Sequence, residues 1–242
     1  MAPIGPGTTR VLITGFGPFH RYKENPSWLA VKPLHGITLT TDSGRPIHIT
    51  TLELPVAYEY VLRNVPGLHK RPPVLPPSAD AGIPLPENGY DFIFHVGVSG
   101  RGPIRIERLG HKYGYDLTLP DADGQFGPIV ILAEGSDSEP VRGFGEGYEA
   151  FPGDLPTDVD VPALVIDLKK DGAELGMSVD AGHYLCDFIL YASLAISRQV
   201  VGPQEKPIPV LFMHVPLPRE VSTEKATDMA RRIILWVCGG LP

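Results

Sequence analysis

The sequence predicts an α/β fold built on a largely parallel sheet that helices cover on both faces. Short apolar runs with strand character alternate with helical patterns along most of the chain. Several of these runs, such as residues 92–96, are almost continuously apolar, which is typical of strands that are buried on both sides. The chain has 242 residues, of which 43% are hydrophobic, so it can bury a full core. We expect a single domain over residues 1–242.

The first predicted unit is a strand, a loop and a helix. Residues 10–14 form a short apolar strand that ends on Gly15. Asn25 is a favourable N-cap and Pro26 suits the first helical position, so a helix is expected to begin there.

A hairpin and a helix come next. Residues 37–41 and 47–54 are rich in β-branched side chains and flank a turn at residues 42–44. A helix over residues 56–64 is expected to follow. The later elements alternate between strands and helices: strand 92–96, helix 161–170, strand 177–179, a helix that carries Cys186, strand 208–214, and a helix from Ser222 or Thr223 to about Val237.

Two stretches interrupt this alternation. Residues 67–89 are rich in proline, and residues 117–160 are rich in glycine and acidic side chains. Both compositions are typical of long surface loops, and we expect insertions there.

The bulk composition excludes several function classes. A formal net charge of −7 and dispersed basic residues argue against a nucleic-acid surface, and a small neutral or cationic ligand fits better. The two cysteines are far apart in sequence, so no disulfide framework is expected and a reducing compartment is indicated. No apolar run approaches the roughly 18 residues of a membrane helix. The sequence therefore predicts a cytoplasmic protein without membrane partners.

Cys186 follows Gly182 at the point where a strand should turn into a helix. The positive end of a helix and a neighbouring histidine can lower a thiol pKa to roughly 3.5–7.5, which makes the sulfur nucleophilic. The alternative is a small hydrophobic residue buried in the core.

Three histidines compete for the role of general base to this thiol. His183 lies three residues before Cys186, but it precedes the helix and could point away. His95 and His214 each stand at the carboxyl end of an apolar strand, the edge at which sites assemble in open α/β sheets. His214 ranks above His95 because residues 215–218 turn the chain sharply after it.

A thiol hydrolase also needs a group that orients the base, and Glu107 is the candidate carboxylate. It follows the glycine-rich turn after the strand at residues 92–96. In the alternative interpretation, Glu107 pairs with Arg105 or Arg108, and a backbone carbonyl orients the histidine.

Other motifs are incomplete. Residues 15–20 follow a strand, but His20 stands where a dinucleotide-binding loop needs glycine. Residues 97–101 approach a nucleophile elbow around Ser99, but Arg101 replaces its last glycine, so a serine hydrolase is only a minor alternative. The eight histidines show no His-Glu-x-x-His spacing and no Asp/His cluster near either cysteine, so no metal site is predicted.

Taken together, four separated blocks resemble pyroglutamyl peptidase type I, a family of cysteine exopeptidases. The blocks are residues 14–19 with 25–28, residues 95–100, residues 107–111, and residues 180–186 followed by 214–216. Each block alone is weak, but their joint occurrence in this order is specific.

The resemblance implies a three-layer α/β/α sandwich with a twisted, mostly parallel mixed sheet, of the phosphorylase/hydrolase-like kind. It implies Cys186 as nucleophile, His214 as general base and acid, and Glu107 as the acidic third member. It implies no metal and no organic cofactor.

The implied substrate is a peptide whose first residue is pyroglutamate (5-oxoproline), a neutral lactam. A flat neutral ring is expected to lie between aromatic faces, which Phe16, Phe19 and Tyr184 would supply. The remaining substrate-binding positions implied by the resemblance are Asn25, Val98 and Leu185, with Val98 acting through its backbone.

Two rival functions remain open at this point. One is a non-catalytic family member that serves as a binding or scaffold module and uses the proline-rich loop for contacts. The other is a serine acyl hydrolase built on Ser99.

Overall fold

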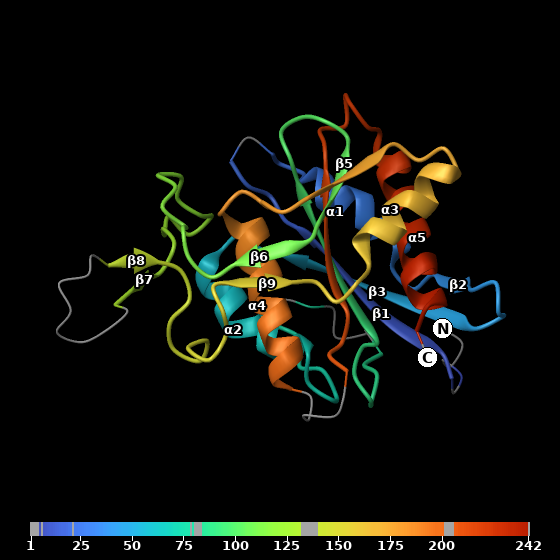
Figure 1. Ribbon diagram of the computed structural model, residues 1–242, viewed down its shortest axis with the longest axis horizontal. Helices are drawn as coiled ribbons and strands as arrows, with labels where there is room; N and C mark the ends of the chain where they lie inside the picture. Colours follow the sequence, from blue (N-terminus) through green and yellow to red (C-terminus); the bar gives the residue numbers. More distant parts are fainter. Residues whose placement is uncertain are drawn as a thin grey trace.

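A seven-stranded sheet forms the centre of the molecule, with strand order β10-β5-β11-β4-β1-β3-β2 (Figure 1). The computed structural model describes residues 5, 7–20, 22–77, 79, 84–131, 140–200 and 206–241. The strands of the sheet are β1 (Thr9–Phe16), β2 (Thr38–Thr40), β3 (Pro46–Leu54), β4 (Phe92–Val98), β5 (Ile104–Glu107), β10 (Leu175–Ser178) and β11 (Val210–Val215). The central strands β3, β1, β4 and β11 run parallel. Antiparallel pairing of β2 with β3 and of β5 with β11 makes the sheet mixed.

Helices cover both faces of this sheet and complete a three-layer α/β/α sandwich (Figure 1). The helices are α1 (Pro26–Val31), followed by a 3-10 turn (Lys32–Leu34), α2 (Tyr58–Leu68), α3 (Val161–Lys170), α4 (Leu185–Gln199) and α5 (Thr223–Gly239). One core cluster joins the sheet to α1, α3 and α5, and the other joins it to α2 and α4. Within the described residues, no helix is long and apolar enough to span a membrane.

Strand β4 shows why the apolar runs become central strands. Phe92, Phe94 and Val96 contribute to the cluster under α1, α3 and α5, whereas Ile93 contributes to the cluster under α2 and α4. A strand that is buried on both faces needs apolar side chains at successive positions, because successive side chains point in opposite directions.

Capping side chains explain where helices α1 and α3 begin. Asn25 accepts a hydrogen bond from the backbone N–H of Ser27 and caps α1, and Asp160 caps α3 in the same way through Ala163. Helix α2 begins at Tyr58, later than expected, and continues to Leu68 with Pro66 inside it. Strand β5 was not expected as a separate element, because it is only four residues long and its pairing with β11 is a long-range contact.

The prediction of a plain surface loop over residues 117–160 is wrong for its second half. Phe144, Tyr148 and Leu155 are buried, and the Phe144 ring stacks on Phe188 of α4 with centroids 4.0 Å apart. These apolar anchors hold the segment against α4. Its described residues also form the short strands β7 (Ile129–Val130), β8 (Val141–Arg142) and β9 (Asp154–Pro156), of which β9 pairs with β6 (Leu109–His111). Residues 132–139 lie outside the described residues.

The proline-rich stretch is closer to its prediction. Val74 and Leu85 are exposed, as expected of a surface loop. Its first residues complete α2, and His69, which ends the helix, is buried. Residues 78 and 80–83 lie outside the described residues.

Candidate active site

The carboxyl ends of β4 and β11 bring three distant parts of the chain together. The parallel register sets His214 on β11 beside Gly97 on β4. Cys186 lies in the first turn of α4 and packs against Gly97: a Cβ atom added to Gly97 would lie 2.7 Å from the Sγ atom of Cys186. The thiol and the imidazole that the sequence predicts as a pair therefore meet at one edge of the sheet.

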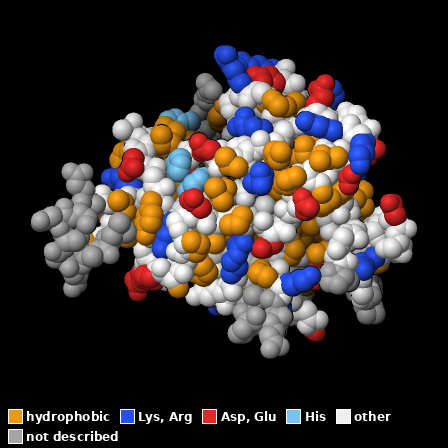
Figure 2. Space-filling model, viewed as in Figure 1, with side chains coloured by type: hydrophobic (Ala, Val, Ile, Leu, Met, Phe, Trp, Pro, Cys, Tyr) orange, Lys and Arg blue, Asp and Glu red, His pale blue; other side chains and the backbone are white. Residues whose placement is uncertain are grey.

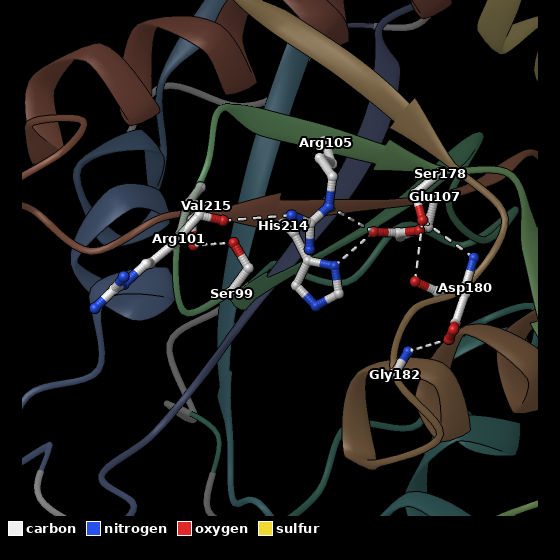
Figure 3. A network of polar contacts seen from close by, with 9 residues as sticks. All are labelled: Ser99, Arg101, Arg105, Glu107, Ser178, Asp180, Gly182, His214 and Val215. Carbon is white, nitrogen blue, oxygen red and sulfur yellow. Dashed lines mark hydrogen bonds and ion pairs between the residues drawn. The ribbon is translucent and has the colours of Figure 1, made fainter.

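Glu107 faces the other side of this histidine. Its Oε1 atom lies 2.6 Å from Nδ1 of His214, and both side chains are buried (Figure 3). The antiparallel pairing of β5 with β11 produces this contact, because it places Glu107 opposite Phe212, two residues before His214. The Nε atom of Arg105 lies 3.9 Å from the same oxygen, so the arginine makes a second, longer ion pair.

The surroundings of His214 favour its protonated form. Burial lowers the pKa of this ring, because a buried charge loses its hydration. The negative charge of Cys186 and its hydrogen bond to the ring, together with the bond and charge of Glu107, outweigh burial and raise the pKa to about 9. The imidazole therefore carries a proton at neutral pH and can act as an acid.

The start of α4 provides a binding place for negative charge next to Cys186. Tyr184 is the N-cap residue, and its side chain makes no capping hydrogen bond. The first N–H groups of a helix have no partner within the helix and carry the positive end of its dipole. An oxyanion formed by attack of the Cys186 sulfur would lie close to these groups.

The two other candidate bases have different surroundings. His95 is fully buried, its Nδ1 atom lies 2.8 Å from the Thr14 hydroxyl, and burial lowers its pKa to about 3. His183 has its Nδ1 atom 3.5 Å from the carboxylate of Asp187. Neither histidine is the partner of Cys186 in this structure.

The expectation that no Asp/His cluster lies near either cysteine is wrong. His111, His183 and Asp187 have potential ligand atoms that all lie within 4.8 Å of one another, and Asp187 is the residue after Cys186. The sequence did not indicate this cluster because His111 is on β6, which packs against α4, although His111 and Asp187 are 76 residues apart along the chain.

Ser99 does not have the surroundings of an activated nucleophile. Its hydroxyl donates to the backbone carbonyl of Val215 at 3.4 Å, and its side chain is drawn beside that carbonyl in Figure 3. A serine nucleophile needs a base that accepts its proton, and a carbonyl oxygen of the backbone is not basic enough for that task. The serine-hydrolase alternative therefore has no support in the geometry.

Aromatic side chains gather beside the start of α4. The rings of Phe19 and Tyr184 lie 5.9 Å apart, and Tyr58 meets Tyr184 edge to face at 5.8 Å. The hydroxyl of Tyr184 donates to the carbonyl of Pro120 at 2.9 Å, which fixes this ring. A hollow of about 440 Å³ opens at Phe19 and is lined by Pro18, Phe19, His20, Tyr22, Lys23, Asp121 and Ala122.

Tyr58 and Asp121 were missed by the sequence reasoning. Tyr58 is the first residue of α2, and Asp121 accepts a hydrogen bond from its backbone N–H at 2.9 Å. The available signal was the absence of a capping side chain at Ala57, since a helix start without a local cap needs a partner from elsewhere.

The other predicted substrate-binding residues differ in how far their side chains are exposed. Phe16 and Leu185 are almost fully buried, and Val98 at the end of β4 is partly exposed. Asn25 is also buried: its Oδ1 atom accepts two hydrogen bonds from Ser27, and its amide donates to the carbonyl of Gly17 at 3.0 Å. These contacts make Asn25 a support for the turn at Gly17, which leads into the hollow at Phe19.

A larger cavity lies elsewhere, at the amino ends of the strands. Its volume is about 910 Å³, and its lining includes Thr9, Asp91 and Pro209. The smaller hollow is the better candidate for substrate binding, because it is lined by Phe19, whose ring lies 5.9 Å from that of Tyr184, two residues before Cys186.

Adding one methyl group at Gly97 tests the close packing of the site. In Gly97→Ala the new Cβ would lie 2.6 Å from the Phe212 ring and 2.7 Å from Cys186 Sγ, both shorter than van der Waals contact. We expect a loss of stability of about 1–3 kcal/mol and, because the thiol must move, a fall in kcat/KM of about 10²-fold. Urea unfolding and steady-state kinetics measure the two effects. The matched control is Gly100→Ala, which meets nothing within 4 Å; equal behaviour of the two variants would contradict the packing argument.

A buried carboxylate, an imidazole and a thiol that meet at the carboxyl edge of an α/β/α sheet define a cysteine-dependent hydrolase. The sequence profile of the pyroglutamyl peptidase family matches residues 9–66 and 78–231, so this chain belongs to that family. The resemblance and the fold class predicted from the sequence are confirmed.

Individual relatives agree with this assignment. The chain is 29% identical to pyroglutamyl-peptidase 1 of Rattus norvegicus over 235 residues, which cover 96% of this chain and 90% of the rat protein. It is 29% identical to the pyrrolidone-carboxylate peptidase of Thermococcus kodakarensis over 216 residues, covering 89% and 85% of the two chains. The crystal structure of pyrrolidone carboxyl peptidase from Fervidobacterium islandicum superposes with a TM-score of 0.67 at 27% identity, and the match covers 95% of this chain and 98% of the other.

Proposed function

We propose that this chain is a cysteine peptidase that removes N-terminal pyroglutamate from peptides through a thioester intermediate. The observation that carries the proposal is the position of His214, which contacts Glu107 on one side and Cys186 on the other. Tyr184, two residues before Cys186, lies beside Phe19 and the hollow that Phe19 lines. The contact of His214 with Glu107 and Cys186 also weighs against the non-catalytic scaffold alternative, because a scaffold has no need of a protonated buried imidazole.

In the first half of the reaction, the Cys186 sulfur attacks the carbonyl carbon of the pyroglutamyl residue. The N–H groups at the start of α4 stabilise the resulting oxyanion. Protonated His214 donates its proton to the leaving nitrogen, the C–N bond breaks, and the pyroglutamyl group stays on the sulfur as a thioester.

The same histidine serves as a base in the second half. Part of the reason for its raised pKa is the negative charge on Cys186, and that charge disappears when the thioester forms. The pKa of His214 must then fall, so the neutral ring can take a proton from water. The hydroxide attacks the thioester, the C–S bond breaks, and free pyroglutamate leaves while Glu107 holds the ring in place.

Recognition of the lactam fits the lining of the hollow. Phe19, which lines the hollow, and the partly exposed ring of Tyr184 beside it offer aromatic surface, which suits a flat ring without a charged amine. Asp121 also lines the hollow, but its two oxygens accept backbone N–H groups from Tyr58, Asp123 and Gln125. These bonds fix the Asp121 carboxylate on the start of α2 and on its own turn.

The decisive experiment compares reporter amides with pyroglutamyl, prolyl and glutamyl groups. We expect hydrolysis of the pyroglutamyl reporter, and rates at least about 10²-fold lower for the other two, since each places a charged amine in the aromatic hollow. Comparable rates on the prolyl reporter would overturn the proposed specificity.

Replacing Glu107 by glutamine tests its role through pH dependence. The His214 proton is lost as the pH rises through about 9, so kcat/KM should fall above that pH. Glu107→Gln removes one of the charges that raise this pKa, so the fall should begin at lower pH, and kcat/KM should decrease by about 10²-fold. Profiles of kcat/KM against pH measure both changes. Exposed Glu174→Gln is the control, and a profile for Glu107→Gln that superposes on the parent would assign Glu107 a purely structural role.

The raised pKa of His214 also makes the stability of the folded protein depend on pH. Folding raises the pKa of His214 from an ordinary value of about 6.5, so its protonated contacts stabilise the folded state fully below that pH. This contribution is lost as the pH rises through about 9.

We further propose that residues 1–242 act as one catalytic domain, because both core clusters combine residues from the two halves of the chain. A thiol nucleophile must stay reduced to work, which supports a cytoplasmic location.

A further inference from the structure

We propose that His111, His183 and Asp187 form a binding site for a divalent transition-metal ion, with Zn²⁺ as the best match. The site is distinct from the Cys186, His214 and Glu107 group, although it begins at the residue after Cys186. Two imidazoles and one carboxylate are a frequent ligand set for zinc and leave a fourth position for water. Calorimetric binding, without turnover, tests this proposal independently of the peptidase assignment.

The distances between the ligand atoms suit such an ion after small adjustments. Nδ1 of His111 lies 2.9 Å from Oδ2 of Asp187, and Nδ1 of His183 lies 3.5 Å from the same oxygen. All three atoms lie within 4.8 Å of one another. Zinc bonds of about 2.0–2.2 Å in a tetrahedron place ligand atoms roughly 3.2–3.6 Å apart. The ion would replace the His111 to Asp187 hydrogen bond and draw the two rings closer.

Surrounding contacts hold two of the ligands in position. Asp187 is fully buried, and its Oδ1 atom accepts the backbone N–H of His111 at 3.0 Å, which leaves Oδ2 for the ion. The hydroxyl of Tyr115 donates to the carbonyl of His111 at 2.5 Å. Such second contacts orient the ligands of metal sites and raise their affinity.

His183 contributes a nitrogen that the described part of the protein leaves unused. Its Nδ1 atom is buried and has no hydrogen-bond partner among the described residues, although it faces Asp187. A buried polar atom without a partner is costly, and a metal bond would remove that cost. Gly114 makes room for this ring, because a Cβ atom there would lie 2.9 Å from the same nitrogen.

The site is accessible from solvent. The side chain of His183 is 36% exposed and that of His111 is 17% exposed. In the view of Figure 2, histidine side chains reach the surface in the region over the start of α4. An ion bound here would connect β6, the turn before α4 and α4 itself, so it should stabilise the folded protein.

The test uses tag-free Cys186→Ala protein, in which the catalytic thiol cannot bind zinc. Titration with zinc chloride alone should show one equivalent bound, and at 100 times the dissociation constant the melting temperature should rise by about 5–10 °C. His183→Asn on this background removes one ligand and keeps a residue that tolerates the positive φ of 47° at this position. We expect the affinity for zinc to fall at least about 10²-fold.

His111→Gln is the second ligand variant, and it should weaken binding to a similar degree if His183→Asn does not fold. His35→Gln is the control. It changes an exposed histidine that directly follows the 3-10 turn Lys32–Leu34, and this variant should bind zinc like the parent. Absence of zinc binding, or binding that both ligand variants retain, would overturn the proposal. So would binding that is lost only when His214 is replaced.

Discussion

The variant Cys186→Ala is expected to lose kcat/KM for a pyroglutamyl amide by about 10⁴-fold or more, because no other group in the site can form the thioester. The side chain is partly exposed at the first turn of α4, so its truncation removes little packing. The urea midpoint should therefore stay close to that of the parent. Steady-state kinetics together with urea unfolding measured by circular dichroism check both parts of this prediction.

The second cysteine supplies a matched control for this result. Cys238 is fully buried in α5, and burial raises the pKa of its thiol to about 12. Cys238→Ala should keep its activity, and iodoacetamide should modify Cys186 first in the parent, with activity lost in step. Normal turnover by Cys186→Ala, or alkylation of Cys238 ahead of Cys186, would refute the thiol mechanism.

His214→Gln is expected to lower kcat/KM by about 10³-fold or more, the second largest effect. A glutamine amide can hydrogen-bond to Glu107, but it can neither protonate the leaving nitrogen nor stabilise negative charge on Cys186. Alkylation of Cys186 at neutral pH should slow for the same reason. The fall in kcat/KM above about pH 9 should disappear, since the group that loses its proton there is gone.

If Cys186 and His214 act together, the effects of replacing them on kcat/KM should not be additive. Residues that act as a unit are not additive, so the double variant Cys186→Ala with His214→Gln should be no slower than Cys186→Ala alone. Rates that multiply in the double variant would show that the two side chains act independently, which would contradict the mechanism.

The amino-acid sequence determined the local structure and the identities of the reactive groups. The cap at Asn25 and the apolar runs near residues 10–14 and 92–96 depend on neighbours along the chain, so their patterns could be interpreted directly. The order of the four resemblance blocks pointed to the family. The composition of the second long segment was less informative, because it did not reveal that Phe144 in this segment stacks on Phe188 of α4.

Tertiary structure alone decided which of these groups meet. His95 and His214 both stand near the ends of apolar strands. The register of β1 with β4 sets His95 beside Thr14, whereas the register of β11 with β4 sets His214 beside Gly97, next to Cys186. Likewise, the antiparallel pairing of β5 with β11 places the Glu107 carboxylate against the His214 ring, so Arg105 is not its only partner. The packing of β6 on α4 brought His111 to Asp187. These contacts join residues far apart along the chain, and their energies depend on burial and register, which no local pattern encodes.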